Sequence, residues 1–592
     1  MKRFLALLLV FLFFLTTAAP DASSAATATA TVPSAAAYLE GQLKAMDKRL
    51  YVFKDSGEGF NNFVEKVWVG SNNRNIPAMT EQAAGQSGTS GIRAEIDFRR
   101  HAWGGYLFAN DTSAKAGMNL SGAAKLSFYA RGEKGGEQVA FYMQGLNAAG
   151  KVWQKHFGSL KLTKKWKRYS ISLKGLDLRR VTGGFGWTAD IFGNGSKKIR
   201  FYIDNIQYAF SKARTQPLFL QSYASAKPGT EAARINSSAY LYDNAVAALA
   251  LSYAGKHTRA RQIADAMVYA QQYDRTFADG RLRNAYMAGD PRSAPGQKSP
   301  RGKAFAKLPG FYDPKAKEYY EDGYAVGTST GNVAWAILGL CEVYRNARSV
   351  SGSAKYLQAA ERAADFVLTL RDDKGGFTGG YEGWEGGQTK ATYKSTEHNI
   401  DLIAAFGQLH SLTGKQKYAD GAAHAKSFVL SVYDSARGCF YTGTEGDGTT
   451  VSKGVLPLDC QTWALLALGK SFTDAAAVLQ FMEADLAYGE GYSFSNDRTR
   501  PGVWLEGTAQ AAVAHLVAGI GTTGKAKHQK LLAFLNRGRY ADGSIPAADR
   551  NFISTGYYDA GTGAPVLYGK RKHTGATAWL SFAQQGRNPL AV

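Results

Sequence analysis

Four acidic residues stand at or near the polar starts of apolar helical segments. They are Asp243, Glu397, Asp459 and Glu506. Hydrolysis of a glycosidic bond requires two carboxyl groups beside the bond, one protonated and one ionised. Acidic side chains also favour helix N-termini because they interact with the free N–H groups and the positive end of the helix dipole. Each acid is therefore interpreted either as half of a catalytic pair or as a helix cap.

Glu397 is the first choice among the four, because its surroundings are unusually polar for a buried helix. His398, Asn399 and Asp401 follow it closely in the chain. We predict that these three side chains contact the substrate. Asp401, one helical turn further along, is also placed to orient Glu397 or His398.

Segments rich in aromatic residues and glycine are expected to overhang the same site. The candidate sugar-binding aromatics are Tyr324, Trp384 and Trp504. The candidate positively charged contacts are Arg281, Lys394 and His573. Positive charge suits an anionic or sulfated glycan, and each of these residues is equally compatible with an ordinary surface charge.

Helices must position these residues, because the sequence has helical periodicity from about residue 237 to the C-terminus. A polar start followed by an apolar helix recurs at 242–253, 329–340, 395–409, 458–468, 505–517 and 573–583. Helices that are apolar on nearly every side are buried all round. Amphipathic helices alternate with them at 258–273, 354–370, 418–433, 475–486 and 525–535. The alternation predicts an inner ring within an outer ring, and a helix expected at 35–50 supplies a twelfth.

Two strings in this region resemble the six-hairpin (α/α)6 glycosidase superfamily. They are Ser-Thr-Glu-His-Asn-Ile-Asp at 395–401 and Glu-Gly-Thr-Ala-Gln at 506–510. The resemblance implies an (α/α)6 toroid over 237–592, with a polysaccharide or oligosaccharide cleft where the inner helices begin. It implies a glycosidase that needs no cofactor for catalysis. Two alternatives stay open: a polysaccharide lyase with His398 or Tyr393 as base, and a non-catalytic glycan-binding or matrix protein.

Short alternating strands separated by glycine-rich turns occupy 51–210, followed by a linker at 211–236. The runs Leu126-Ser127-Phe128-Tyr129-Ala130 and Trp166-Lys167-Arg168-Tyr169 resemble jelly-roll carbohydrate-binding modules. The resemblance implies an antiparallel β-sandwich. Candidate sugar-stacking aromatics are Trp103, Tyr106 and Trp187, for which a place in the core is the alternative. Candidate ligands of a structural calcium ion are Asp55, Glu58 and Asp204.

The first residues predict a secretory signal at 1–25. Lys2 and Arg3 precede an apolar run from Phe4 to Leu15, and small residues follow. Residues 26–50 are expected to form a leader and the helix mentioned above. We therefore expect a secreted protein, in the periplasm or outside the cell.

The formal net charge is +23, which raises the question of a nucleic-acid partner. The positive charge is spread along the chain and no compact nucleic-acid motif is present, so an anionic glycan or the anionic cell surface is the better partner. A merely solvated basic surface is the alternative. The sequence has three cysteines, of which Cys439 and Cys460 either pair or stay free, and no spacing fits a zinc site. The oligomeric state is not predicted.

Overall fold

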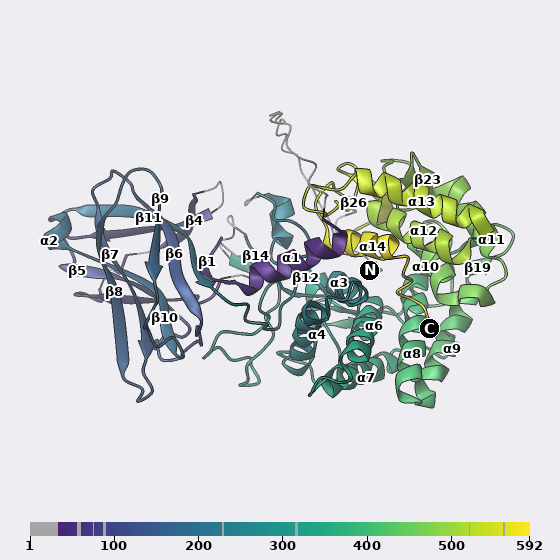
Figure 1. Ribbon diagram of the computed structural model, residues 1–592, viewed down its shortest axis with the longest axis horizontal. Coiled ribbons are helices and arrows are strands. Elements are labelled where there is room, and N and C mark those ends of the chain that lie inside the picture. The colour runs from purple at the N-terminus through teal and green to yellow at the C-terminus, as the bar shows by residue number, and fades with distance from the viewer. Residues whose placement is uncertain are drawn as a thin grey trace.

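The computed structural model describes residues 33–55, 61–74, 76–77, 79–86, 90–227, 230–313, 316, 318–519, 521–559 and 563–592. Antiparallel sheets dominate its N-terminal part and helices its C-terminal part (Figure 1). The prediction of mixed β and α structure with antiparallel sheets is confirmed. The predicted signal at 1–25 lies outside the described residues.

Two antiparallel sheets share one buried core in the N-terminal part. The first sheet has the order β3-β4-β11-β6-β9, and β1 also pairs with β11; its strands are β1 (Arg49–Phe53), β3 (Thr80–Ala84), β4 (Ser90–Asp97), β6 (Ala123–Gly132), β9 (Lys167–Ser172) and β11 (Lys198–Phe210). The second has the order β2-β5-β10-β7-β8; its strands are β2 (Glu65–Gly70), β5 (Trp103–Ala109), β7 (Gln138–Leu146), β8 (Val152–Lys161) and β10 (Val181–Asp190). The short helix α2 (Ile191–Asn194) follows β10.

Two aromatics that we predicted on a sugar-binding surface lie in this core instead. Trp187 is 0% exposed and meets the Phe201 ring edge-on, with the ring centroids 4.8 Å apart. Tyr106, directly opposite Trp187 in the sheet, is 8% exposed and donates its hydroxyl hydrogen to the Pro77 carbonyl. The surface role is wrong for both, because the inward face of the second sheet carries them. Trp103 is 44% exposed and stays a candidate.

The expected calcium ligands already have protein partners. An Asp55 carboxylate oxygen accepts hydrogen bonds from the Ser90 amide at 2.9 Å and the Ser90 hydroxyl at 3.2 Å. Asp204 accepts from the amides of Gln86 and Asn205. Glu58 lies outside the described residues, and within those residues no three His, Cys, Asp or Glu side chains gather as metal ligands. The calcium ion therefore stays a prediction.

Six helices form a closed ring in the C-terminal part. They are α3 (Leu241–Tyr253), α6 (Thr330–Ala347), α8 (Thr396–Thr413), α10 (Leu458–Leu468), α12 (Leu505–Ala518) and α14 (Thr574–Gln585). Each packs against the next in this order, and α14 packs against α3. Small residues allow the close packing: a Cβ atom at Gly339 of α6 would lie 3.4 Å from the Ala245 carbonyl oxygen of α3.

An outer layer of helices packs on the ring. It consists of α4 (His257–Gln272), α7 (Ala354–Leu368), α9 (Gln416–Ser431), α11 (Ala475–Phe481) and α13 (Gly521–Arg537), which pack on α3, α6, α8, α10 and α12 respectively. The N-terminal helix α1 (Ala35–Asp47) packs on α14 and α3. It therefore belongs to the ring in space although the sandwich separates the two in sequence (Figure 1). None of the helices in the described part of the chain is long and apolar enough to cross a membrane.

Short strands and turns fill the connections that lead into the inner helices. They are η1 (Glu231–Ile235), β12 (Ser238–Tyr240), β13 (Ala285–Met287), β14 (Gly310–Asp313), β15 (Glu318–Glu321), α5 (Gly323–Val326), β16 (Thr328–Ser329), β17 (Gly380–Glu382), β18 (Thr389–Lys390), β19 (Tyr433–Asp434), β20 (Cys439–Phe440), β21 (Gly443–Thr444), β22 (Val451–Ser452), η2 (Gly469–Ser471), η3 (Met482–Leu486), β23 (Ala487–Tyr488), β24 (Gly491–Tyr492), β25 (Ile553–Tyr558) and β26 (Pro565–Tyr568). All three cysteines are buried and free, so Cys439 and Cys460 do not pair.

Candidate active site

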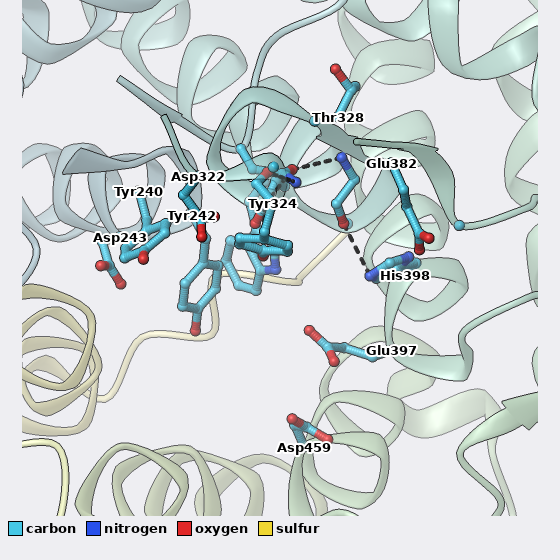
Figure 2. Close-up of a pocket in the computed structure, with 18 of the residues that line it drawn as sticks. Tyr240, Tyr242, Asp243, Asp322, Tyr324, Thr328, Glu382, Glu397, His398 and Asp459 are labelled. Atoms are coloured by element: carbon cyan, nitrogen blue, oxygen red, sulfur yellow. Dashed lines mark hydrogen bonds between the residues drawn. The ribbon is translucent and has the colours of Figure 1, made fainter. Parts of the chain in front are cut away.

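A cavity of about 480 Å³ opens where the six inner helices begin, a size typical of a small-molecule site. Every inner helix contributes a residue of its cap or first turn to the wall: Asp243, Asn332, Glu397, Asp459, Glu506 and His573. The structure thus brings the four predicted acids to one cavity, and Figure 2 shows Glu397 and Asp459 both directed into it. Six positive helix ends meet there, which favours negative charge.

Glu397 is held in its protonated form. Burial raises the pKa of Glu397 well above its usual range, and the nearby Asp459 and Glu506 raise it further. Burial also raises the pKa of Asp459, to about 7; the Cys460 amide, which donates to Asp459 Oδ1 at 2.7 Å, lowers this pKa, and Glu506 raises it. At neutral pH Glu397 is therefore an acid with a proton to give.

Glu506 and Asp243 lie on either side of an imidazolium. His573 Nδ1 is 3.2 Å from Glu506 Oε2, and His573 Nε2 is 3.1 Å from Asp243 Oδ1. Burial alone lowers the pKa of His573, but the two carboxylates raise it to about 10. The ring also stacks on Tyr223, with centroids 4.2 Å apart.

A tyrosine holds the other oxygen of Glu506. The Tyr242 hydroxyl donates to Glu506 Oε1 at 2.6 Å and in turn accepts from the Trp579 indole N–H at 2.6 Å. Glu506 therefore has a cationic partner on one oxygen and a hydroxyl donor on the other. Both interactions fix the position of the carboxyl group. The cavity thus holds one carboxyl group that burial favours in its neutral form and another that is held by two partners.

His398 lies next to Glu397 and is neutral. Its Nε2 is 3.2 Å from the Ser329 hydroxyl oxygen, and burial lowers its pKa to about 4. Gly331 allows α6 and α8 to come this close, because a Cβ atom there would lie 2.4 Å from His398 Cδ2. A neutral imidazole can donate or accept hydrogen bonds with sugar hydroxyl groups.

Four predicted substrate contacts do not lie on the cavity wall. Asn399 is buried, and its side chain binds the backbone of Phe377 and Ser395. Asp401 is buried further along α8, where burial raises its pKa well above the usual range and Glu397 adds to the rise. The other two are Arg281 and Lys394. For Asn399 and Asp401 the prediction of substrate contact is wrong, because the side chains point into the protein.

Arg281 and Lys394 serve local structure. Arg281 forms a two-bond ion pair with Asp279, at 2.6 Å for the shortest contact, and its NH1 nitrogen donates to Gln388. Lys394 is 1% exposed and donates to the Gly375 carbonyl at 2.8 Å. Neither reaches the cavity, so the predicted positive contacts from these two residues are wrong.

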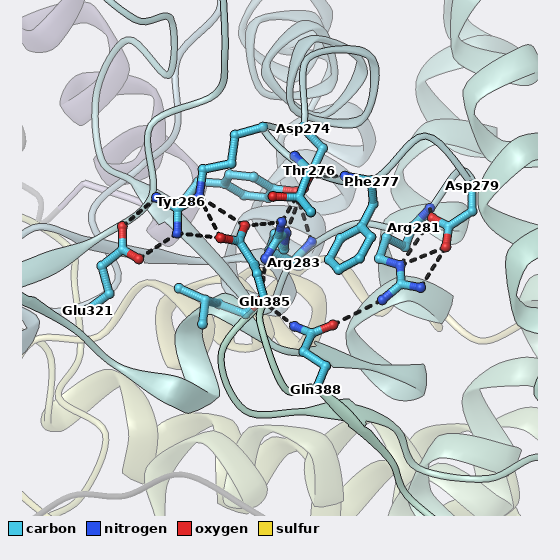
Figure 3. A network of polar contacts seen from close by, with 12 residues as sticks. Asp274, Thr276, Phe277, Asp279, Arg281, Arg283, Tyr286, Glu321, Glu385 and Gln388 are labelled. Carbon is cyan, nitrogen blue, oxygen red and sulfur yellow. Dashed lines mark hydrogen bonds and ion pairs between the residues drawn. The ribbon is translucent and has the colours of Figure 1, made fainter. Parts of the chain in front are cut away.

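The three predicted aromatics, Tyr324, Trp384 and Trp504, line the cavity. Trp384 is 60% exposed, and its indole N–H donates to the Glu321 carbonyl at 3.1 Å. A network of ion pairs fixes the surrounding loops (Figure 3). Arg275 pairs with Glu321 at 2.6 Å and with Glu385 at 2.8 Å.

The centre of this network is Arg283, which is fully buried. It pairs with Asp274 at 2.6 Å and with Glu385 at 2.5 Å (Figure 3). Glu385 follows Trp384 directly, so the network connects the aromatic rim of the cavity to the segment after α4. This arrangement positions Trp384 as a flat apolar surface at the mouth.

Sequence reasoning missed the cavity floor. Trp335 and Trp463 line it, with ring centroids 5.1 Å apart, and Trp579 stacks on Trp463 at 5.9 Å. Each is the sixth residue of its helix, in α6, α10 and α14, which are alternate members of the ring. A tryptophan at this fixed distance from a polar helix start is the signal that would have found them. Further missed wall residues are Tyr223, Tyr240, Tyr242, Gln510, Tyr558 and Tyr568, whereas Asp322 and Glu382 belong to the segments that were expected to overhang the site.

The cavity has the opposite charge to the chain as a whole. Acidic residues on its described wall are Asp243, Asp322, Glu382, Glu397, Asp459, Glu506 and Asp559. No Lys or Arg lies among the described wall residues, and His573 is already bound by two carboxylates. The wall therefore suits an uncharged, hydroxyl-rich ligand better than an anionic one.

No family model matches this chain, and no curated protein matches it. Among solved structures, a glycosidase in complex with glucose is 13% identical with a TM-score of 0.38, covering 60% of this chain and 88% of that one. Cellobiose 2-epimerase from Bacillus thermoamylovorans B4167 is 10% identical with a TM-score of 0.41, covering 62% and 93%. A family 30 carbohydrate-binding module of Clostridium thermocellum is 14% identical with a TM-score of 0.22, covering 28% and 98%. These values assign no family.

The raised pKa of Asp459 predicts a stability that depends on pH. Its pKa rises from 3.8 to about 7 on folding, so its contribution is fully present below pH 3.8 and is lost as the pH rises through 7. Asp459→Asn is expected to raise the free energy of unfolding at pH 8 by about 2–4 kcal/mol and to change it little at pH 4. Denaturant unfolding at both pH values measures this. The exposed Asp420→Asn is the control, and equal effects at the two pH values would contradict the burial argument.

Proposed function

We propose that the protein is a glycoside hydrolase in which Glu397 is the general acid and Glu506 the general base. One observation carries the proposal: a buried, protonated Glu397 and a Glu506 bound by His573 and Tyr242 line the same cavity. Asp459, with a pKa of about 7, is only partly ionised at neutral pH and is the weaker candidate for the base. Asp243 is placed to share the positive charge of His573.

The proposed reaction follows from the raised pKa of Glu397 and from the contacts of Glu506. Glu397 gives its proton to the glycosidic oxygen as the bond from that oxygen to the anomeric carbon breaks. Glu506 accepts a proton from a water molecule, whose oxygen forms the new bond to the anomeric carbon. His573 and Tyr242 hold Glu506 in place during this step, and neither of them loses its proton.

The favoured substrate is an oligosaccharide or polysaccharide of uncharged sugars. Aromatic side chains on the floor and at the mouth fit the apolar faces of pyranose rings. A lyase acting on a uronic acid needs a cation at the sugar carboxylate, and the described wall offers no Lys or Arg. Tyr393, a candidate lyase base, donates to Glu382 at 3.1 Å, and burial raises its pKa well above the usual range. The hydrolase is therefore better supported than the lyase.

We propose that the chain is secreted, on the strength of its first 25 residues, and that the sandwich binds glycan or the anionic cell surface. The exposed Trp103 is the remaining aromatic candidate among the three. The test compares the retention of the full chain and of its Trp103→Ala variant in gels that contain polysaccharide. A core residue such as Trp187 is unsuitable for this test, because its removal would unfold the sandwich.

A panel of glycans tests the proposed activity. New reducing ends on neutral glycans, without absorbance of an unsaturated product, are expected. An unsaturated product from an acidic glycan would overturn the hydrolase in favour of a lyase. Interconversion of sugars without new reducing ends would indicate an isomerase or epimerase, and binding without products would indicate a non-catalytic protein.

Trp384→Ala is expected to raise KM about 3–10-fold and to change kcat little, because stacking of about 0.5–1.5 kcal/mol is present before and during the reaction. Steady-state kinetics on an oligosaccharide measures both constants. Tyr320→Ala is the control, since Tyr320 is an exposed aromatic in the neighbouring hairpin but does not line the cavity. A large loss of kcat at constant KM in Trp384→Ala would mean that Trp384 acts in the transition state instead.

A further inference from the structure

A second cavity, of about 400 Å³, lies between the sandwich and the helical ring. Its wall comes from α1, β1, the segment 214–225 and residues of the helical part, namely 289–290, 307, 542, 572 and 574. Tyr223 borders both this cavity and the active-site cavity. The second cavity therefore adjoins the proposed active site without being part of it.

The wall of this cavity is positively charged. Its charged residues are Arg49, Lys54, Arg214, Asp290, Lys307, Asp542 and Lys572. Both acids already have partners: Arg292 binds Asp290 at 2.6 Å, and Lys572 binds Asp542 at 2.6 Å. A surplus of positive charge remains, in contrast to the acidic wall of the first cavity.

Two cations of the wall, Lys307 and Arg214, form no direct ion pair with an acid among the described residues. The Arg214 guanidinium donates to the carbonyls of Asp47 at 3.3 Å and Arg49 at 3.0 Å and lies over the Phe210 ring, 4.3 Å from its centroid. The Asp290 and Asp47 carboxylates act on its charge from beyond ion-pair distance. For Lys307, no hydrogen bond or ion pair of the ammonium group involves a described residue. Hydrogen bonds to Pro291 and Met287 fix its backbone.

Both cations line the same cavity and are poorly solvated. Burial lowers the pKa of Arg214 to about 10 and also lowers the pKa of Lys307. Asp290 and Arg292 act on the charge of each, and Asp47 acts on Arg214 as well. A buried cation without a counter-charge is costly, and an anion that pairs with it recovers the cost.

We propose that this cavity binds an anionic group, a carboxylate, sulfate or phosphate, between Lys307 and Arg214. A lysine and an arginine that face one space are the usual protein partners of such groups. The group would be either a free ion or an acidic substituent of a glycan. Because α1, β1 and the ring all contribute to the wall, the bound anion would connect the sandwich to the ring. The proposal does not depend on the hydrolase activity.

The test uses the full chain with inorganic phosphate as the probe. Phosphate is expected to raise the thermal midpoint by several degrees over chloride at equal ionic strength, and titration calorimetry should detect its binding. Lys307→Met is expected to weaken phosphate binding at least tenfold, whereas Lys307→Arg should retain it. Lys303→Met is the control, since Lys303 is exposed and lies off the wall.

Lys307→Met removes a buried cation that has no direct ion pair among the described residues, so the variant is expected to fold and to be at least as stable as the parent in chloride. A general stabilising effect of phosphate through exclusion from the surface would be equal in parent and variant. Equal phosphate binding by the two proteins would therefore overturn the proposal. A second titration compares a sulfated with an uncharged oligosaccharide and separates the two sources of the anion. If the parent prefers the sulfated sugar and Lys307→Met abolishes this preference, the site binds a glycan substituent. If only phosphate binds, the site binds a free ion.

Discussion

Glu397→Gln is expected to lower turnover by about 10²–10⁴-fold, the usual contribution of general acid catalysis, and to leave the thermal midpoint nearly unchanged. Glutamine keeps the shape of the side chain but has no acidic proton. Burial and the neighbouring acids keep Glu397 neutral in the parent, so the substitution exchanges one neutral group for another. Stability at neutral pH should therefore change little.

The leaving group provides a sharper measurement than turnover alone. A substrate whose leaving group is already acidic, such as a nitrophenyl glycoside, needs little protonation by the enzyme. The loss of kcat in Glu397→Gln should therefore be small for that substrate and large for a natural glycoside. In the parent, activity should fall as the pH rises through the raised pKa of Glu397. This alkaline fall should likewise be small for the nitrophenyl glycoside and large for a natural glycoside.

Glu382→Gln is a matched control for this experiment. Glu382 lines the same cavity, burial raises its pKa, and it binds Tyr393 instead of the proposed catalytic groups. The helix-cap interpretation of Glu397 predicts the reverse result, a loss of about 1 kcal/mol in stability with near-normal turnover. A leaving-group effect of equal size in the two variants would also count against Glu397 as the acid.

The apolar helices predicted a closed ring, because each of them needs neighbours all round. The resemblance to the six-hairpin superfamily implied that the helix starts, and with them the four acids, share one site. The catalytic roles that we propose were not predictable, because they depend on His573, which is far from Glu506 and Asp243 in sequence. Nothing local to these acids indicates which one an imidazolium holds.

Arg281 was predicted wrongly although the sequence contained the reason. Asp-X-Arg occurs at Asp47, Asp97, Asp177, Asp279 and Asp290. The last four aspartates bind the arginine two residues later with both carboxylate oxygens, whereas Asp47 binds Arg259. In those four cases the charge of the arginine is satisfied before any ligand arrives. The same motif accounts for the Arg292 that occupies Asp290 beside the second cavity.

For Trp187 and Tyr106 the sequence left the surface and the core as alternatives, for a different reason. Alternation along a strand indicates which residues share a face, but it does not indicate which face is covered. Their strands, β10 and β5, are rich in glycine, so neither face looked distinctly polar. Packing of the second sheet on the first determines which face is buried, and this packing joins residues far apart in sequence.

His573→Gln is expected to lower the free energy of unfolding by about 3–5 kcal/mol and to abolish most activity at neutral pH. The imidazolium is buried between two buried carboxylates, Asp243 and Glu506, at 3.1 and 3.2 Å. Glutamine can hydrogen-bond to a carboxylate but carries no charge. Two carboxyl groups then remain buried close together without the cation that both contact, so Glu506 loses the group that holds it in place.

The pH dependence of stability distinguishes this effect from a simple loss of packing. Folding raises the pKa of His573 from 6.5 to about 10, so its contribution is fully present below pH 6.5 and is lost as the pH rises through 10. The parent should therefore lose stability between pH 7 and pH 10, and His573→Gln should lose less over the same interval. Unfolding in denaturant across this range measures the difference, with the exposed His156→Gln as the control.

A double-mutant cycle with Asp243→Asn completes the test. If the harm in His573→Gln comes from two uncompensated carboxylates, removing one of them should restore part of the stability, and the double variant should be more stable than His573→Gln alone. Glu506 would then keep the Tyr242 hydroxyl as its donor. Additive losses would instead mean that the imidazole ring acts only by filling space against Tyr223. Asp243→Asn leaves the His573–Glu506 pair in place, so that single variant should retain more activity than His573→Gln. This comparison separates the role of Asp243, which shares the positive charge, from that of His573, which carries it.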